Sequence, residues 1–143
     1  MTPIVPGGKP RTGAIPVRVL CVDDNRDVAD SSVDFFSVTG TTARACYDGP
    51  SALAEIPTFQ PDVCLIDLNM PGMDGDALAV HIRERFDPCP TLIALTAMSD
   101  DKSRGRIEAA GFDLHLVKPV DPYQLSELVN TLSDAGGPRA EPR

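Results

Sequence analysis

The sequence contains no tryptophan, and phenylalanine and tyrosine together make up only 5% of its 143 residues. A core with few large rings must rest mainly on Val, Leu, Ile and Ala, a composition typical of a parallel sheet covered by helices. Hydrophobic residues account for 42% of the chain, which is enough for a packed core and excludes a disordered protein. The length fits one domain with short tails.

The sequence also lacks a long apolar run and an excess of positive charge. No stretch approaches the length of a membrane span, and the N-terminus has no apolar signal-peptide core. The net charge of −8 makes the surface repel nucleic acid and anionic membranes. We therefore predict a cytoplasmic protein that binds neither nucleic acid nor a membrane directly.

Paired cysteines are missing as well. None of the four cysteines forms a CxxC motif, and His81 and His115 are not spaced with them as zinc ligands. Cys21 and Cys64 lie inside apolar runs, so we interpret them as small buried hydrophobic residues in a reducing compartment.

Proline and glycine mark the ends of the domain. Residues 1–16 contain four prolines and three glycines, which predicts a flexible N-terminal tail or linker. Residues 134–143 are polar and rich in the same two residue types, and we interpret them as a flexible C-terminal tail with no output domain after it. The predicted domain spans residues 17–133.

Short apolar runs alternate with longer amphipathic segments within this domain. Each run has roughly the 4–6 residues of a buried strand, and the runs are Val17–Val22, Thr42–Cys46, Val63–Ile66, Thr91–Leu95 and Leu114–Val117. The predicted helices lie near Arg26–Thr39, Pro50–Ile56, Gly75–Phe86 and Asp100–Ala110, with a fifth that begins at Asp121-Pro122. The second is expected to stop before Pro57, because proline cannot continue a helix. This alternation predicts βαβ units and a parallel sheet.

Polar side chains follow four of the five predicted strands. Ligands of an open parallel sheet bind at the carboxyl ends of its strands, near a topological switch point. The residues at those ends are Asp23 and Asp24 after the first strand, Asp67 after the third, Thr96 after the fourth and Lys118 after the fifth. Each of them alone is explained as a turn residue, a helix cap or a surface charge. Their joint occurrence at the ends of four strands favours a single site.

The residue types of this site predict its chemistry. Three clustered carboxylates repel one another and require a cation, and hard oxygen ligands select Mg²⁺ before Ca²⁺. A carboxylate beside a bound cation suggests phosphoryl transfer, in which the carboxylate attacks and the metal neutralises phosphoryl oxygens. A hydroxyl and an ammonium group would hold the remaining oxygens.

Four stretches of the sequence together identify a family. They are Val22-Asp23-Asp24-Asn25, the segment from Leu65 to Gly75 (LIDLNMPGMDG), Ala94-Leu95-Thr96-Ala97 and Val117-Lys118-Pro119. Over about Val17 to Leu132 the chain resembles the receiver domains of two-component response regulators. The resemblance implies an α/β, flavodoxin-like fold: a five-stranded parallel sheet with the order 2-1-3-4-5, flanked by five helices.

The resemblance also implies a role for each residue of the site. Asp67 would be the phosphoacceptor, and Thr96 and Lys118 would contact the phosphoryl oxygens. Mg²⁺, with Mn²⁺ as a substitute, would be bound by Asp67, by Asp24 directly, by Asp23 largely through water and by the backbone carbonyl of Asn69. The Lys118–Pro119 peptide bond would be cis.

A two-state switch is a further implication of the resemblance. Thr96 would move inward on phosphorylation, and the residue three positions before the lysine would follow it. That residue is usually Tyr or Phe, and here it is His115. Either His115 is a switch with a pH-sensitive charge, or it is a half-exposed residue that tolerates both positions. Asn69 and Met98 would border the path of the hydrolytic water.

The implied partners are a histidine kinase or a histidine phosphotransfer protein as donor, and a downstream protein that binds the face of the fourth helix, fifth strand and fifth helix. The domain would not be an enzyme, although it would assist transfer to its own Asp67. Whether it is a stand-alone regulator or the receiver module of a hybrid histidine kinase stays open. Two competing hypotheses are a phosphate-independent binding module of the same fold and an Asp-nucleophile phosphatase. A phosphatase of this kind has a DxD motif after its first strand, and this sequence does not.

Overall fold

The computed structural model describes residues 17–97 and 100–134 of the chain. The predicted N-terminal tail lies outside the described residues, and so does the C-terminal tail except for Asp134. The strands are β1 (Arg18–Val22), β2 (Thr42–Cys46), β3 (Val63–Asp67), β4 (Thr91–Thr96) and β5 (Leu114–Val117). The helices are α1 (Arg26–Val38), α2 (Gly49–Phe59), α3 (Gly75–Arg85), α4 (Asp101–Ala110) and α5 (Pro122–Asp134).

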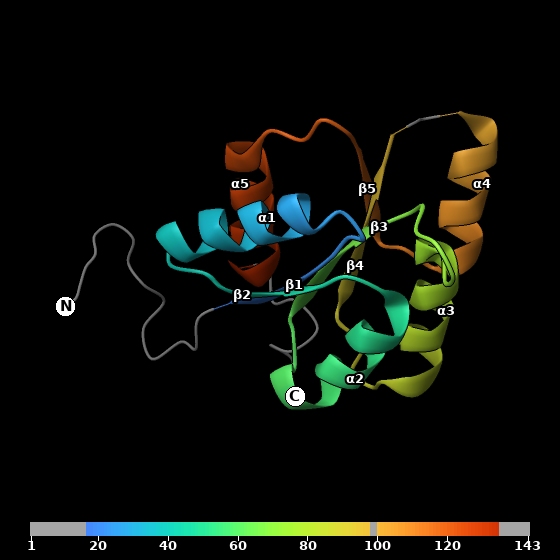
Figure 1. Ribbon diagram of the computed structural model, residues 1–143, viewed down its shortest axis with the longest axis horizontal. Coiled ribbons are helices and arrows are strands. Elements are labelled where there is room, and N and C mark those ends of the chain that lie inside the picture. Colours follow the sequence, from blue (N-terminus) through green and yellow to red (C-terminus); the bar gives the residue numbers. More distant parts are fainter. Residues whose placement is uncertain (1–16, 98–99, 135–143) are drawn as a thin grey trace.

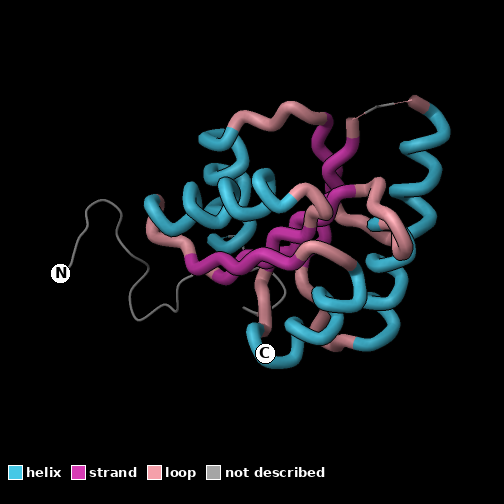
Figure 2. Tube along the Cα trace, viewed as in Figure 1, coloured by secondary structure: helices cyan, strands magenta, loops and turns pink. Residues whose placement is uncertain are grey.

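The five strands form one parallel sheet with the order β2-β1-β3-β4-β5, which confirms the predicted flavodoxin-like topology. Helices α1 and α5 cover one face of the sheet, and α2, α3 and α4 cover the other (Figures 1 and 2). The order reverses at β1, whose one neighbour is β2 and whose other neighbour is β3. The carboxyl ends of β1 and β3 therefore meet at the switch point where ligands of such sheets bind.

Alternating residues of the central strands fill two separate core clusters. Leu20 and Ile66 point into the cluster beneath α2 and α3, whereas Val19 and Leu65 point into the cluster beneath α1 and α5. Every residue of β3 is buried. The central strands are thus rigidly packed on both sides, as expected for a parallel sheet between two helical layers.

Polar side chains in the loops after the strands cap the N-termini of helices. The Asn25 side chain accepts a hydrogen bond from the backbone N–H of Val28 at the start of α1, and Asp100 accepts one from Ser103 at the start of α4. The predicted cap Asp121 accepts one from Tyr123 at 2.9 Å. These contacts satisfy N–H groups that the first turn of a helix leaves unpaired.

The prediction that the second helix stops before Pro57 is wrong. Helix α2 continues through Pro57 to Phe59 and ends at Gln60, which has a left-handed backbone conformation. Proline removes one backbone hydrogen bond near the end of this helix. Ile56 and Phe59 on either side are only 4% exposed, and their burial offsets that loss.

Cys21, Cys46 and Cys64 are buried, Cys89 is half-buried, and all four thiols are free. Burial raises the pKa of Cys21 to about 12 and that of Cys46 to about 11. Both therefore stay protonated and behave as small packing residues. No helix within the described ranges combines the length and the apolar character that a membrane crossing requires.

Candidate functional site

The carboxyl edge of the sheet brings the predicted polar residues together. Asp67 and Thr96 are the last residues of β3 and β4, one position further along each strand than the apolar runs predicted. The sheet therefore fixes their backbones directly: Asp67 pairs with Leu95, and Thr96 pairs with Val117. Thr96 is buried, and its carbonyl oxygen accepts a hydrogen bond from the backbone N–H of Lys118 at 2.7 Å.

Three carboxylates converge at this edge. One oxygen from each of Asp23, Asp24 and Asp67 lies within 4.8 Å of the others. Asp23 is 4% and Asp67 8% exposed, whereas Asp24 is open to solvent. The backbone N–H groups of Asn25 and Asn69 donate to Asp23 and Asp67 respectively, at 2.9 and 3.4 Å. Oxygen ligands at this spacing, with one side open to water, fit a hard divalent cation such as Mg²⁺.

Lys118 extends from the end of β5 into the same cluster. Its Nζ lies 3.3 Å from Asp67 Oδ1 and 3.5 Å from Asp23 Oδ2, so it bridges the two buried carboxylates. The peptide bond that joins it to Pro119 is cis. One ammonium group beside three carboxylates leaves an excess of negative charge, which the cation would neutralise.

The pKa of Asp67 is raised to about 6, chiefly by burial and then by the neighbouring Asp23 carboxylate, whereas Lys118 opposes both effects. A bound divalent cation would favour the ionised form, which is the nucleophilic form of a carboxylate. An ionised Asp67 and a cation beside it would therefore stabilise each other.

Gly75 allows the first turn of α3 to pack closely against the backbone of the carboxylate site. Its backbone N–H donates to the carbonyl oxygen of Leu68 at 2.9 Å. A Cβ atom at this position would collide with the carbonyl oxygen of Asp67 and with Ile66 and Leu68. The first turn of α3 therefore packs directly against the backbone of the candidate phosphoacceptor.

The remaining predicted residues are more peripheral. Asn69 is exposed, and its side-chain oxygen accepts a hydrogen bond from Arg106 at 2.9 Å. His115 is exposed on β5, where it pairs with Ala94 in the middle of the neighbouring strand. Its predicted role as a switch stays a prediction, and Met98 lies outside the described residues.

Sequence reasoning missed Arg106, which reaches from α4 to the loop after β3. Its guanidinium group contacts Asn69, the carbonyl oxygen of Leu68 and the carboxylate of Asp76. One signal was present in the sequence: Arg106 lies four residues before Ala110, which belongs to the short apolar stripe of α4. Residues with this spacing share a helix face, so Arg106 had to border the contact with α3.

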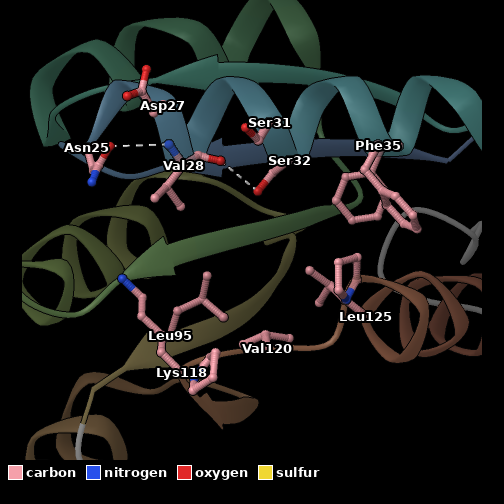
Figure 3. A pocket seen from close by; sticks show the side chains of 13 residues that line it. Asn25, Asp27, Val28, Ser31, Ser32, Phe35, Leu95, Lys118, Val120 and Leu125 are labelled. Atoms are coloured by element: carbon pink, nitrogen blue, oxygen red, sulfur yellow. Dashed lines mark hydrogen bonds between the residues drawn. The ribbon is translucent and has the colours of Figure 1, made fainter.

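A groove of about 680 Å³ opens between α1 and the start of α5, next to the carboxylate cluster. Figure 3 shows its apolar side chains: Phe35 and Val28 come from α1, and Leu95 and Leu125 from the opposite wall. Lys118 lines this groove as well as contacting Asp67. No sequence pattern predicted this groove, because a groove depends on how far apart two helices pack.

Comparison with known proteins assigns the chain to a family. Residues 19–130 match the family model described as the response regulator receiver domain. The response regulator MprA of Mycobacterium ulcerans is 36% identical over 113 residues, covering 79% of this chain and 47% of MprA. The transcriptional regulatory protein PrrA of Mycobacterium tuberculosis is 34% identical over 118 residues, covering 82% of this chain and 49% of PrrA. The chain thus spans about half the length of these curated relatives.

Solved structures give the same result. The receiver domain of the Francisella response regulator 1452 superposes with a TM-score of 0.75 at 29% identity, covering 83% of this chain and 98% of that one. The signal receiver domain of a signal transduction histidine kinase from Syntrophus aciditrophicus superposes with a TM-score of 0.76 at 27% identity, covering 83% and 91%. With the match over residues 19–130, these likenesses show that the chain belongs to the response regulator receiver domain family.

Proposed function

We propose that this domain accepts a phosphoryl group from a phosphohistidine onto Asp67, with Mg²⁺ bound beside it, and that the phosphorylated form changes its binding to a partner. The observation that supports the proposal most directly is the cluster itself. Three carboxylates lie within 4.8 Å of one another, and the ammonium group of Lys118 lies 3.3 Å from Asp67.

In the proposed reaction an oxygen of Asp67 attacks the phosphorus atom. The bond from phosphorus to the imidazole nitrogen of the donor breaks, its electron pair returns to the imidazole, and an acyl phosphate forms. Asp23, Asp24 and the carbonyl of Asn69 would hold the ion. When bound, Mg²⁺ neutralises charge on the phosphoryl oxygens. The ammonium group of Lys118 and the hydroxyl of Thr96 would bind oxygens of the phosphoryl group.

We further propose that the donor is a histidine kinase or a histidine phosphotransfer protein, and that it docks in the groove between α1 and α5. The groove is mainly apolar and shares Lys118 with the carboxylate cluster, so a donor seated there brings its phosphohistidine next to Asp67. Val28 lines the groove and is 40% exposed, which makes it available to a partner.

The proposed output surface is the face of α4, β5 and α5. Its exposed apolar side chains support a protein contact, because β5 is an edge strand; they are Leu114 and Val117. A cytoplasmic location and a function without direct nucleic-acid contact are part of the same proposal. The relatives include full response regulators and the receiver domain of a histidine kinase, so a regulator and a hybrid-kinase module both stay open.

The experiment that tests the proposal is intact-protein mass spectrometry after incubation with acetyl phosphate or phosphoramidate, with and without Mg²⁺. We expect a single Mg²⁺-dependent addition of about 80 Da that is lost in Asp67→Asn. If wild type and Asp67→Asn gain the same mass, Asp67 is not the acceptor.

If neither gains mass from these donors or from phosphohistidine proteins, the domain is a phosphate-independent binding module of this fold. A multiple-turnover assay with a phosphoester separates the remaining alternative. A receiver domain traps a stoichiometric phosphoryl group, whereas an Asp-nucleophile phosphatase releases many equivalents of phosphate.

A further inference from the structure

We propose that Arg106 is a positioning residue for the phosphoryl-transfer site: its guanidinium group on α4 holds Asn69 in place beside Asp67 and ties the loop after β3 to α4. This inference rests on the proposed function, because it concerns the same site. It adds a residue of helix α4, whereas the proposed ligands of the metal and the phosphoryl group all lie at strand ends or in the loops that follow them.

The contacts of Arg106 occupy most of the donors of its guanidinium group. Nε and Nη2 donate to the two carboxylate oxygens of Asp76 at 3.0 and 3.1 Å, which is a bidentate pair. Nη1 donates to the side-chain oxygen of Asn69 at 2.9 Å, and Nη2 also lies 3.4 Å from the carbonyl oxygen of Leu68. Oδ2 of Asp74 lies 3.7 Å from Nη2 of Arg106. One side chain thus contacts four residues from the end of β3 to the first turn of α3.

This loop carries the proposed chemistry. Asn69 lies two residues after Asp67, and its backbone N–H donates to Asp67 Oδ1 at 3.4 Å. Its carbonyl is the proposed backbone ligand of Mg²⁺. Asn69 is exposed and lies in a segment without helix or strand, so its own packing fixes it weakly. The hydrogen bond from Arg106 supplies the missing constraint.

The bidentate pair with Asp76 fixes the guanidinium group before it meets Asn69. Arg106 is 26% exposed and Asp76 27% exposed, so the pair is partly shielded from solvent. A lysine could replace the charge but not the fork of parallel N–H donors. The arrangement is that of an outer residue that orients a ligand, and removal of such residues weakens metal binding although they do not touch the ion.

A second arginine provides a matched control. Arg83 of α3 donates to the carbonyl oxygen of Gly111, just after the end of α4, at 2.9 and 2.5 Å, and pairs with Asp113 at 2.9 Å. It therefore also ties α3 to α4, but at the end of the helices away from the loop after β3. Arg83→Ala removes a comparable tie without touching Asn69.

The test has two readouts on the full chain. Isothermal titration calorimetry with Mg²⁺ alone measures binding to the unphosphorylated protein, and intact mass after removal of acetyl phosphate measures the lifetime of the phosphorylated form. We expect Arg106→Ala to raise the Mg²⁺ dissociation constant about tenfold. We expect the lifetime of the phosphorylated form to change as well, and Arg106→Lys to keep most of the defect. Arg83→Ala should match wild type in both readouts.

A double-variant cycle shows whether Arg106 acts through Asn69. In an Asn69→Ala background, Arg106→Ala should add little to the change in Mg²⁺ affinity, because its target is already gone. Equal Mg²⁺ affinities for Arg106→Ala and Arg83→Ala would overturn the inference, and so would additive effects of the two substitutions.

The outcomes for wild type separate the two proposals. Wild type that binds Mg²⁺ but takes no phosphoryl group contradicts the proposed function and leaves the calorimetric comparison decisive for Arg106. Wild type that binds no Mg²⁺ contradicts both.

Discussion

Neighbouring helices are linked in different ways within the two layers that cover the sheet. Between α3 and α4 the links are charged: Arg106 pairs with Asp76, and Arg83 contacts Gly111 and Asp113. Between α1 and α5 the links are apolar, and a groove of about 680 Å³ stays open between them. Directional hydrogen bonds set a geometry, whereas apolar walls accept a variety of surfaces. We infer that the first layer positions the site and the second receives a partner.

The largest expected effect breaks the close approach of α3 to the site. Gly75→Ala places a Cβ against the backbone of Asp67, the last residue of the buried strand β3, and of Leu68, which is hydrogen-bonded to Leu95, so neither can move aside. We expect a loss of about 3 kcal/mol in the free energy of unfolding, measured by urea denaturation. The matched control is Gly105→Ala on α4, where a Cβ meets open space. That variant should gain about 0.5–1 kcal/mol. Equal stabilities of the two variants would contradict the tight packing of α3.

A charge in the groove tests the second layer. Val28→Glu places a carboxylate among apolar side chains, so we expect transfer from a phosphorylated histidine kinase to slow about tenfold. Phosphorylation by acetyl phosphate, which needs no docking surface, should keep its wild-type rate. Val38→Glu is the control, because Val38 lies at the far end of the same helix and is 86% exposed. Slowing by both substitutions alike would show that the added charge, and not the groove, is responsible.

The smallest expected effect is a pH dependence, and it tests the ion pair between Arg106 and Asp76 that links α4 to α3. The hydrogen bonds from Arg106 hold the pKa of Asp76 below its ordinary value of 3.8. A carboxyl group whose pKa is lowered by folding stabilises the protein above its unfolded pKa and loses that contribution as the pH falls through the folded one. The stability difference between wild type and Arg106→Ala should therefore be largest at neutral pH and shrink below about pH 4.

Urea denaturation from pH 7 to pH 3 measures that difference. In an Asp76→Asn background the effect of Arg106→Ala should no longer vary with pH in this range. A variation that persists there would assign the pH dependence to another group.

Local patterns in the sequence were enough to predict the strands, their order by family resemblance, and the residues at the carboxyl edge. Asp67 and Thr96 were expected after their strands and proved to be the last strand residues, because the backbone ladder continues past the apolar run. Pro57 was misjudged because the burial of its neighbours outweighs its local preference. The partners of Arg106 and the groove depend on how α4 and α5 pack against distant segments: the spacing to Ala110 indicated only which face of α4 carries Arg106, and the groove has no local pattern.

The pairing of Asp67 with Leu95 has a mechanical consequence. The backbone N–H of Leu68 donates to the carbonyl oxygen of Leu95 at 2.8 Å, so the chain is held by β4 on both sides of the Asp67 carboxyl group. The backbone that carries this side chain is therefore held in place when a group is added to the carboxylate. The displacement that this group causes must be taken up beyond the sheet, in the loops that leave β3 and β4. Those loops lead to α3 and α4, the two helices that Arg106 ties together.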